Sequence, residues 1–493
     1  MFESAELGHR VSKEQYAKEE PGVRSALLGA QLRVLERAEF PIILLSGGVD
    51  GSGKGEVVNT LLEWMDPRHI LVHAMGPPND EELARPPLWR FWRALPPKGK
   101  MGVYFGSWYS APIVDRVYDR IGGAELARNL AEISRFERML SDEGALVVKF
   151  WLHLSRSAQK KRFDELERDP ATAWRVSKED WSHRKRYGSF RAVSEQALRE
   201  TSTAEAPWTV VEASDRRYRN LTVGRALLEA MARRLERKPT RLVRAAPPPA
   251  PAIDQRNLIE ELDLTASLTR RQYDKRLPEQ QARLNALSRD RRFRDDRACA
   301  LVFEGNDAAG KGGAIRRSTH ALDARRYHVI PIAAPTEEER AQPYLWRFWR
   351  HIPRRGHFAV FDRSWYGRVL VERVRGLAAE PDWMRGYREI VDFEEALVRA
   401  GIVVVKFWLA ISAEEQLARF KAREKVAFKR FKLTKEDWRN RDKWGAYEQA
   451  VCDMVDRTGT EVAPWHLVEG NDKKWARVKV VQTIADAIEK SLR

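Results

Sequence analysis

The chain has 493 residues, which is too long for one ordinary hydrophobic core and indicates more than one domain. Its formal net charge is +17, which favours polyanionic partners such as nucleic acid, an acidic membrane or another phosphate-rich molecule, although a well-solvated basic surface explains the charge equally well. Its two cysteines exclude a disulfide scaffold or a cysteine-based zinc site and fit a reducing compartment.

The beginning of the chain carries no apolar targeting signal. Residues 1–8 lack the continuous apolar stretch of a signal peptide, and no later apolar run approaches the ~20 residues that span a bilayer. We therefore expect a cytoplasmic protein with no membrane partner.

The first half contains a phosphate-binding sequence pattern. A short apolar run, Ile42–Leu45, reads as a buried parallel strand and precedes the pattern GxxxxGK, which runs from Gly48 to Lys54. In such a loop the glycines let backbone N–H groups converge on phosphate oxygens, the next helix presents its positive end, and the lysine supplies a cation. A second strand is predicted at Leu146–Leu152.

A proline-rich segment divides the chain. Residues 245–251 read Ala-Ala-Pro-Pro-Pro-Ala-Pro, which can form neither a helix nor a central strand and acts as a semi-rigid spacer. We predict a first domain at residues 1–240, a linker at 241–254 and a second domain at 255–493.

The second half repeats the first at a constant offset of 257 residues. The offset joins Lys54 to Lys311, and it holds from Gly48 to Trp208, so a domain has been duplicated with almost no net insertion. Strands are predicted at Ala300–Phe303, Ala359–Phe361 and Ile402–Leu409, with helical spacing at 383–400 and a basic helical region at 413–432. This alternation predicts an α/β fold with two tandem domains, each a parallel sheet covered by helices on both faces.

The second loop departs from the usual motif at one position. Gly312, like Gly55 in the first loop, stands where Ser or Thr normally helps to hold Mg²⁺. The metal must therefore be held by other groups, and Asp307 in the loop and Asp362 after a predicted strand are the candidates, because carboxylates are good hard ligands for Mg²⁺. The alternative role for Asp362 is a helix cap or a turn residue.

Only the second half is chemically complete. Asp362, Arg363 and Arg368 correspond to Phe105, Gly106 and Ala111, none of which can ligate a metal or neutralise charge. We expect the first half to be catalytically inactive, with a loop that either binds phosphate or serves as packing surface. In the second half we expect Lys311 and Arg363 to stabilise a transferring phosphoryl group.

The predicted phosphate-binding set combines loop residues with nearby arginines, whose guanidinium groups can grip phosphate oxygens in a bidentate manner. Its members are Gly305, Asn306, Ala308, Ala309, Gly310, Gly312, Arg368 and Arg419. The hexapeptide Leu345–Arg350 also carries arginines, but it recurs in the first half at 88–93, so we interpret it as a structural helix packed on the sheet.

Several motifs in the second half, in the same order along the chain, resemble the polyphosphate kinase 2 family. They are Glu304-Gly-Asn-Asp-Ala-Ala-Gly-Lys-Gly312, Phe361-Asp-Arg-Ser-Trp-Tyr-Gly-Arg368, Val405-Lys-Phe-Trp408, Lys432-Leu-Thr-Lys-Glu-Asp-Trp438 and Thr458-Gly-Thr-Glu-Val-Ala-Pro-Trp465. The resemblance is to the two-domain members, and degraded versions of these motifs cover most of the first half.

The resemblance implies a P-loop kinase-like fold with a helical lid, in which inorganic polyphosphate replaces ATP as phosphoryl donor. It implies catalytic roles for Asp307, Lys311, Asp362 and Arg363, Mg²⁺ held by Asp307 and Asp362, and lid contacts to phosphate from Lys429, Arg430 and Lys432, with Arg441 nearby. The implied reaction converts AMP to ADP, with AMP, ADP and polyphosphate as partners and a homodimer as a possible assembly.

Three alternatives remain open from the sequence. A polyphosphate-dependent nucleoside diphosphate kinase would share every motif. An ATP-using nucleotide kinase is disfavoured by the missing Ser or Thr after Lys311. A nucleic-acid-binding P-loop protein would explain the charge and the tryptophans, but we expect no nucleic-acid partner because the arginines accompany a catalytic set.

Overall fold

The computed structural model describes residues 1–236, 258–426 and 434–493. The chain forms two compact units, the first comprising Met1–Pro78, Arg90–Leu242 and Thr336–Trp346, and the second comprising Asn79–Trp89, Val243–Pro335 and Arg347–Arg493. Of the predicted segments, the whole linker at 241–254 and the lid residues Lys429, Arg430 and Lys432 lie outside the described residues.

The first half of the chain contains a five-stranded parallel sheet with the strand order β2-β3-β1-β4-β5. Its strands are β1 (Ile42–Gly48), β2 (Ile70–Ala74), β3 (Met101–Phe105), β4 (Leu146–His153) and β5 (Trp208–Glu212). Its helices are α1 (Lys13–Arg37), α2 (Lys54–Trp64), α3 (Asp80–Leu83), α4 (Trp89–Arg93), α5 (Ser110–Val117), α6 (Gly123–Asp142), α7 (Arg156–Arg168), α8 (Lys178–Lys185), α9 (Tyr187–Thr201) and α10 (Arg216–Glu236).

The second half contains an equivalent parallel sheet with the strand order β10-β9-β6-β8-β7. Its strands are β6 (Ala298–Gly305), β7 (Tyr327–Pro331), β8 (Phe358–Asp362), β9 (Ile402–Ala410) and β10 (Trp465–Glu469). Its helices are α11 (Arg270–Arg289), α12 (Arg291–Asp296), α13 (Lys311–His320), α14 (Glu337–Arg340), α15 (Trp346–Trp349), α16 (Val371–Val374), α17 (Glu380–Arg399), α18 (Ala413–Glu424), α20 (Lys435–Asp442), α21 (Trp444–Thr458) and α22 (Lys473–Ser491).

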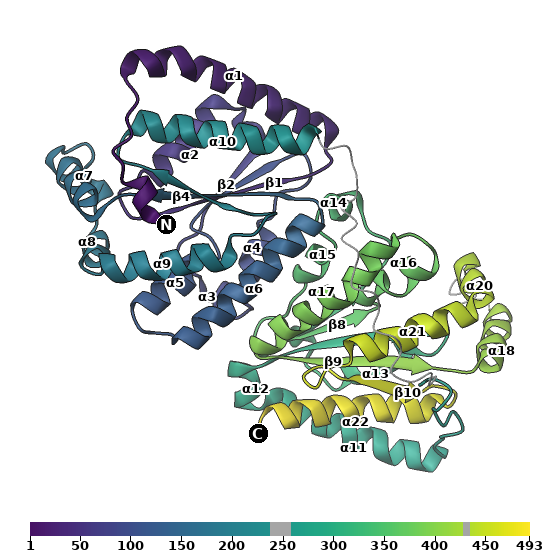
Figure 1. The fold of residues 1–493 in the computed structure, drawn as a ribbon. Helices are drawn as coiled ribbons and strands as arrows, with labels where there is room; N and C mark the ends of the chain where they lie inside the picture. Colours follow the sequence, from purple (N-terminus) through teal and green to yellow (C-terminus); the bar gives the residue numbers. More distant parts are fainter. Residues whose placement is uncertain (237–257, 427–433) are drawn as a thin grey trace. The chain divides into compact units, whose positions relative to one another are not determined.

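Helices cover both faces of each sheet. In the first unit, α1, α2 and α10 lie over one face and α5, α6 and α9 over the other; in the second, α11, α13 and α22 lie opposite α17 and α21 (Figure 1). The strands are apolar on both sides because each side faces a helical layer. Along β9, for example, Val405, Phe407 and Leu409 join the core beneath α22. The predicted α/β fold is confirmed.

One buried ion pair lies on the opposite face of each sheet. Lys406 on β9 donates hydrogen bonds to Glu394 at 2.7 Å, to the hydroxyl of Tyr366 at 2.9 Å and to the carbonyl of Thr458 at 2.7 Å. Lys406 and Glu394 are at most 1% exposed. The first unit repeats the arrangement with Lys149 and Glu137, also 2.7 Å apart.

The tryptophan-rich hexapeptide is structural, as predicted, and forms the short helices α4 and α15. Trp346, Phe348 and Trp349 are buried, and the rings of Trp349 and Phe393 pack edge to face with centroids 5.1 Å apart. None of the helices that the structure describes is long and apolar enough to cross a membrane.

Candidate active site

The glycine loop of the second unit connects β6 to α13. Gly305 ends β6 with φ +148°, and a Cβ at this position would lie 2.4 Å from the carbonyl oxygen of Leu409, so only glycine fits. Gly310, with φ +109°, caps α13, and Lys311 is its first residue. The Lys311 ammonium donates a hydrogen bond to the Gly305 carbonyl at 2.7 Å. The loop, the helix N-terminus and the lysine together form an anion-binding turn.

Asp307 lies at the centre of this turn. One carboxylate oxygen accepts a hydrogen bond from the Asn440 amide of α20 at 2.8 Å, and the other lies 3.4 Å from the Arg363 guanidinium. Asn440 itself accepts a hydrogen bond from the Tyr447 hydroxyl at 3.1 Å. Burial, reinforced by the charge of Asp307, raises the pKa of Tyr447 to about 12, so this hydroxyl stays protonated at neutral pH.

Arg363 follows β8 in a left-handed backbone conformation, with φ +65°. Its N–H donates to the carbonyl of Phe303 at 3.1 Å, which fixes the chain beside β6. Burial opposes the guanidinium charge, but the carboxylates of Asp307, Glu304 and Asp362 outweigh it and hold the pKa of Arg363 above its usual value. Arg363 is therefore a fixed positive charge facing the loop, with its side chain half exposed.

Glu304 is a candidate site residue to which the sequence analysis gave no role. It precedes Gly305, is 6% exposed, and accepts a hydrogen bond from the Ser364 hydroxyl at 2.8 Å. Burial raises its pKa, while the charges of Lys311 and Arg363 act in the opposite direction. The sequence does distinguish this residue. The corresponding residue of the first half is Gly47, so the acidic side chain occurs only before the glycine loop of the second half.

A cavity of about 90 Å³ opens at this point. Its walls combine charged groups with aromatic rings: Glu304, Asp307, Lys311, Arg363, Asn440, Trp408, Trp444 and Tyr447. The structure therefore brings together three of the four predicted catalytic residues. Asp362 lies at the end of β8 and influences the charge of Arg363, but it is not among the lining side chains.

The structure corrects the prediction that Arg419 binds phosphate. Its side chain is 6% exposed, and all five of its N–H groups are engaged by protein: it donates to Glu415 and to the carbonyls of Ala308, Ala309, Gly470 and Asn471. A guanidinium with no free donor cannot bind a substrate oxygen. Arg419 instead holds the glycine loop in place through its hydrogen bonds to the loop carbonyls.

Other predicted phosphate ligands also make contacts within the protein. Arg368 pairs with Glu372 at 3.0 Å and does not line the cavity. Asn306 lines the cavity, but its side-chain oxygen accepts a hydrogen bond from the Ile411 N–H at 3.2 Å and fastens the loop to the end of β9. Arg441 donates to the Ala413 carbonyl at 2.7 Å. The backbone N–H groups of the loop therefore remain the main candidates for binding phosphate.

The side chains near the loop suit a hard cation shared with substrate. Within the described residues no group of three or more His, Cys, Asp or Glu side chains forms a metal site by itself. Asp362 has no side-chain hydrogen bond to another described residue, and Asp307 and Asp362 both act on the charge of Arg363. Two carboxylates with phosphate oxygens and water make an adequate coordination sphere for Mg²⁺.

The first unit has lost this arrangement. Asp50, the counterpart of Asp307, lies 2.8 Å from His183 and 3.4 Å from Lys54. Phe105 and Gly106 replace Asp362 and Arg363. Gly106 has φ +82°, and a Cβ there would lie 2.5 Å from the carbonyl oxygen of Met75.

A buried arginine is hydrogen-bonded to the glycine loop of the first unit. Arg219 is 3% exposed and donates to the Ser52 carbonyl and to Glu56, both at 3.0 Å. Glu56 also pairs with Arg162 at 2.7 Å. The inactivity of the first unit stays a prediction, which rests on the missing counterparts of Asp362 and Arg363.

Comparison with known proteins is consistent with this geometry. The family model for polyphosphate kinase 2 matches residues 10–239 and 267–493, one copy in each half. The chain is 57% identical over 492 residues to a polyphosphate:AMP phosphotransferase of Pseudomonas aeruginosa, covering 99% of both chains. It is 54% identical to one from Pseudomonas syringae, covering 100% of this chain and 99% of that relative.

A solved structure has the same fold over the whole chain. It is the crystal structure of a Pseudomonas aeruginosa protein assigned to polyphosphate kinase 2, with a TM-score of 0.90, 55% sequence identity and coverage of 100% of this chain and 99% of that one. Each half contains a parallel sheet with a glycine loop that ends in a lysine, and only the second half carries all the motifs. Together with these matches, this arrangement shows that the chain belongs to the polyphosphate kinase 2 family.

Proposed function

We propose that the chain transfers the terminal phosphoryl group of inorganic polyphosphate to AMP, giving ADP and a polyphosphate shorter by one unit. The observation that carries this proposal is the convergence of Asp307, Lys311 and Arg363 on one cavity of the second unit. Relatives that match nearly the full chain have this activity as their name.

The reaction needs little covalent chemistry from the protein. An oxygen of the AMP phosphate forms a bond to the terminal phosphorus while the bond from that phosphorus to the bridging oxygen of the chain breaks. AMP is largely dianionic at neutral pH, so no strong general base is required. Positioning and charge neutralisation account for most of the acceleration in phosphoryl transfer.

The residues of the second unit divide this work. Lys311 and the loop N–H groups bind the terminal phosphate, and Arg363 neutralises the charge that develops on the transferring group. Asn440 and Arg363 hold the carboxylate of Asp307 in place. Asp307 and Asp362 would hold Mg²⁺, which when bound supplies additional positive charge to the phosphate oxygens. Trp444 and Tyr447 provide an aromatic wall on which an adenine can pack.

The direct test is ADP formation from AMP, polyphosphate and Mg²⁺ in the absence of ATP. We expect Lys311→Ala to lower turnover by about 10²-fold or more, because a cation aimed at the transferring group is lost. The matched control is Lys54→Ala in the first loop, which should retain turnover. If Lys54→Ala abolished activity in a folded protein and Lys311→Ala did not, the working unit would be the first.

The same assay separates the alternatives. ADP as a better acceptor than AMP would indicate a nucleoside diphosphate kinase, and ATP as a better donor than polyphosphate would indicate an ATP-using kinase. We propose that neither occurs, and that nucleic acid does not bind in competition with polyphosphate. Gel filtration with light scattering tests the proposed homodimer.

A further inference from the structure

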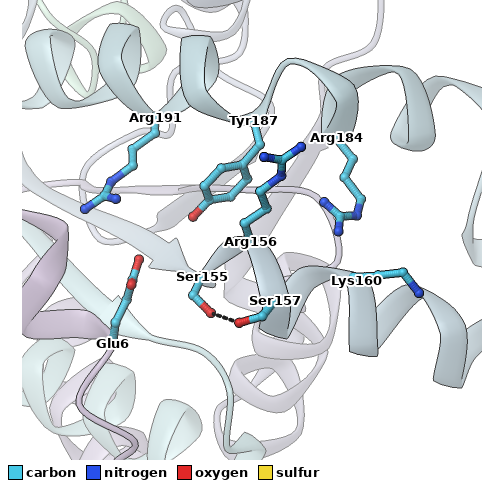
Figure 2. Close-up of a pocket in the computed structure, with 8 residues that line it drawn as sticks. All are labelled: Glu6, Ser155, Arg156, Ser157, Lys160, Arg184, Tyr187 and Arg191. Carbon is cyan, nitrogen blue, oxygen red and sulfur yellow. Dashed lines mark hydrogen bonds between the residues drawn. The ribbon is translucent and has the colours of Figure 1, made fainter.

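The first unit contains a basic pocket that the proposed reaction does not use. Its volume is about 560 Å³, within the range of ordinary ligand sites. It lies beyond the carboxyl end of β4, where ligands of open α/β sheets gather. Four cationic side chains from α7, α8 and α9 surround it: Arg156, Lys160, Arg184 and Arg191 (Figure 2).

Two of these cations have no partner among the residues that the structure describes. Arg156 and Arg184 make no hydrogen bond or ion pair with any other described residue, and Figure 2 shows both guanidinium groups on the same side of Tyr187. Lys160 and Arg191 are paired with Asp164 at 2.8 Å and with Glu3 at 2.6 Å. Guanidinium groups that converge without an acid repel one another, so the pocket favours an anion.

The single acid of the pocket does not neutralise it. Glu6 lies on the opposite side from Arg156, and its carboxylate is 2.7 Å from Nε2 of the buried His153 (Figure 2). The hydroxyl of Tyr187 donates to the Leu154 carbonyl at 2.8 Å, and its ring is 7% exposed. The pocket therefore offers no exposed aromatic surface to a nucleotide base, and the polar groups that it presents are mostly cationic.

The charge of this pocket is not inherited from the catalytic half. At the offset of 257, Arg156, Lys160 and Arg191 correspond to Ala413, Leu417 and Glu448. Ser157 corresponds to Glu414, and only Arg184 has a basic counterpart, Arg441. The lining is thus strongly positive in the first unit and net negative at the same positions of the second, so a remnant of the active site does not explain it.

We propose that this pocket, which we call the α7–α9 pocket, is an accessory binding site for inorganic polyphosphate. The inference rests on the proposed function, because that function makes polyphosphate the anion the chain encounters. A long polyphosphate held in the first unit stays tethered to the molecule that carries the catalytic loop, which raises its local concentration there. The catalytically inactive unit would then serve in donor capture.

The kinetic test uses Arg156→Ala/Arg184→Ala in the full chain, since neither substitution removes a bond within the described protein. We expect the KM for long-chain polyphosphate to rise about fivefold or more, while kcat, the KM for AMP and the KM for tripolyphosphate stay unchanged. The matched control is Arg33→Ala/Arg128→Ala, which removes two exposed arginines of the same unit from α1 and α6. Equal KM values for the two double variants would overturn the proposal.

A binding test separates this proposal from the proposed function. Fluorescence anisotropy of end-labelled polyphosphate is titrated against Lys311→Ala, with and without Arg156→Ala/Arg184→Ala. We expect Lys311→Ala/Arg156→Ala/Arg184→Ala to bind polyphosphate at one site fewer than Lys311→Ala alone. This readout needs no turnover, so it holds even if polyphosphate proved not to be the donor. Unchanged binding, or specific binding of labelled AMP that Arg156→Ala/Arg184→Ala removes, would overturn the assignment.

Discussion

Arg363 combines a strained backbone with a functional side chain. A left-handed conformation costs a residue with a Cβ roughly 1–2 kcal/mol, and such strain concentrates at functional sites. The counterpart Gly106 adopts the same region with φ +82° and carries no charge. The difference fits our proposal that the guanidinium acts beside Asp307, which would explain why the second unit keeps a residue with a Cβ at this position.

This predicts the behaviour of Arg363→Gly. Relief of strain and the greater chain entropy of unfolded glycine nearly cancel, so the free energy of unfolding should change by about 1 kcal/mol or less. Turnover should fall about 10³-fold, because a charge that stabilises the transferring group is lost. Urea denaturation and the ADP assay measure the two effects. Arg363→Ala, which keeps the strain, should lose as much turnover; activity within tenfold of the parent would refute the role.

At the residue scale, the sequence predicts which side chains lie together where a motif determines both the residue types and the path of the backbone. Asp307 and Lys311 lie in one short loop, so their proximity follows from the GxxxxGK spacing. Asn440 could not be found this way, because its role depends on α20 packing over a loop that is 133 residues away in sequence. Arg419 was misassigned for a related reason: sequence reveals a cation but not the carbonyls that engage it.

At the scale of elements, the buried Lys406–Glu394 pair joins β9 to α17 and, through Thr458, to α21. Burial lowers the pKa of Lys406 and raises that of Glu394, so each ion depends on its partner to remain charged. The strands and helices themselves were predictable from apolar runs and their spacing. This pair was not, because a lysine in a strand does not reveal which helix supplies the acid.

Lys406→Met should therefore destabilise the second unit by about 3–5 kcal/mol, because it leaves Glu394 buried without its counter-ion. Lys406→Met/Glu394→Leu should recover most of the loss. The midpoint of urea unfolding, followed by tryptophan fluorescence, measures both. The matched control is Lys149→Met, which should destabilise the first unit instead; a shift below ~1 kcal/mol in both single variants would contradict the account.

The Asp50–His183 pair makes the stability of the first unit depend on pH. The hydrogen bond to Asp50 raises the pKa of His183 above 6.5, although burial opposes it, and Glu179 lies 3.7 Å away. Burial disfavours the Asp50 carboxylate, but Lys54 and His183 outweigh it and lower its pKa to about 2. The stabilisation from His183 is complete below pH 6.5 and is lost as the pH rises through its raised pKa.

We therefore expect the melting temperature of the first unit to fall as the pH rises above about 6.5 and through the raised pKa of His183. His183→Asn, which installs the residue found at 440, should flatten that dependence. At the acid end the contribution of Asp50 is complete above its ordinary pKa of 3.8 and is lost as the pH falls through its lowered pKa of about 2. Differential scanning calorimetry across this range tests both limbs, and an unaltered profile in His183→Asn would show that another group titrates.

At the scale of the whole molecule, the net charge of +17 suits a flexible polyanion. Neutralising closely spaced phosphates releases counterions, so binding weakens steeply as salt rises. We expect the KM for long polyphosphate to rise about tenfold or more between ~50 and ~200 mM KCl, and the KM for AMP to change less. Steady-state kinetics at constant Mg²⁺ measures both, and equal salt dependence would argue against an extended basic surface.

The backbone around Gly106 leaves little room for the arginine that stands at the equivalent position, 363, of the second unit. Any side chain at 106 would place its Cβ 2.5 Å from the Met75 carbonyl oxygen, so restoring arginine alone requires the neighbouring segment to shift. Such a change gains nothing until Phe105 is also replaced by an acid. A single substitution therefore cannot give this half the chemistry that we propose for the second unit.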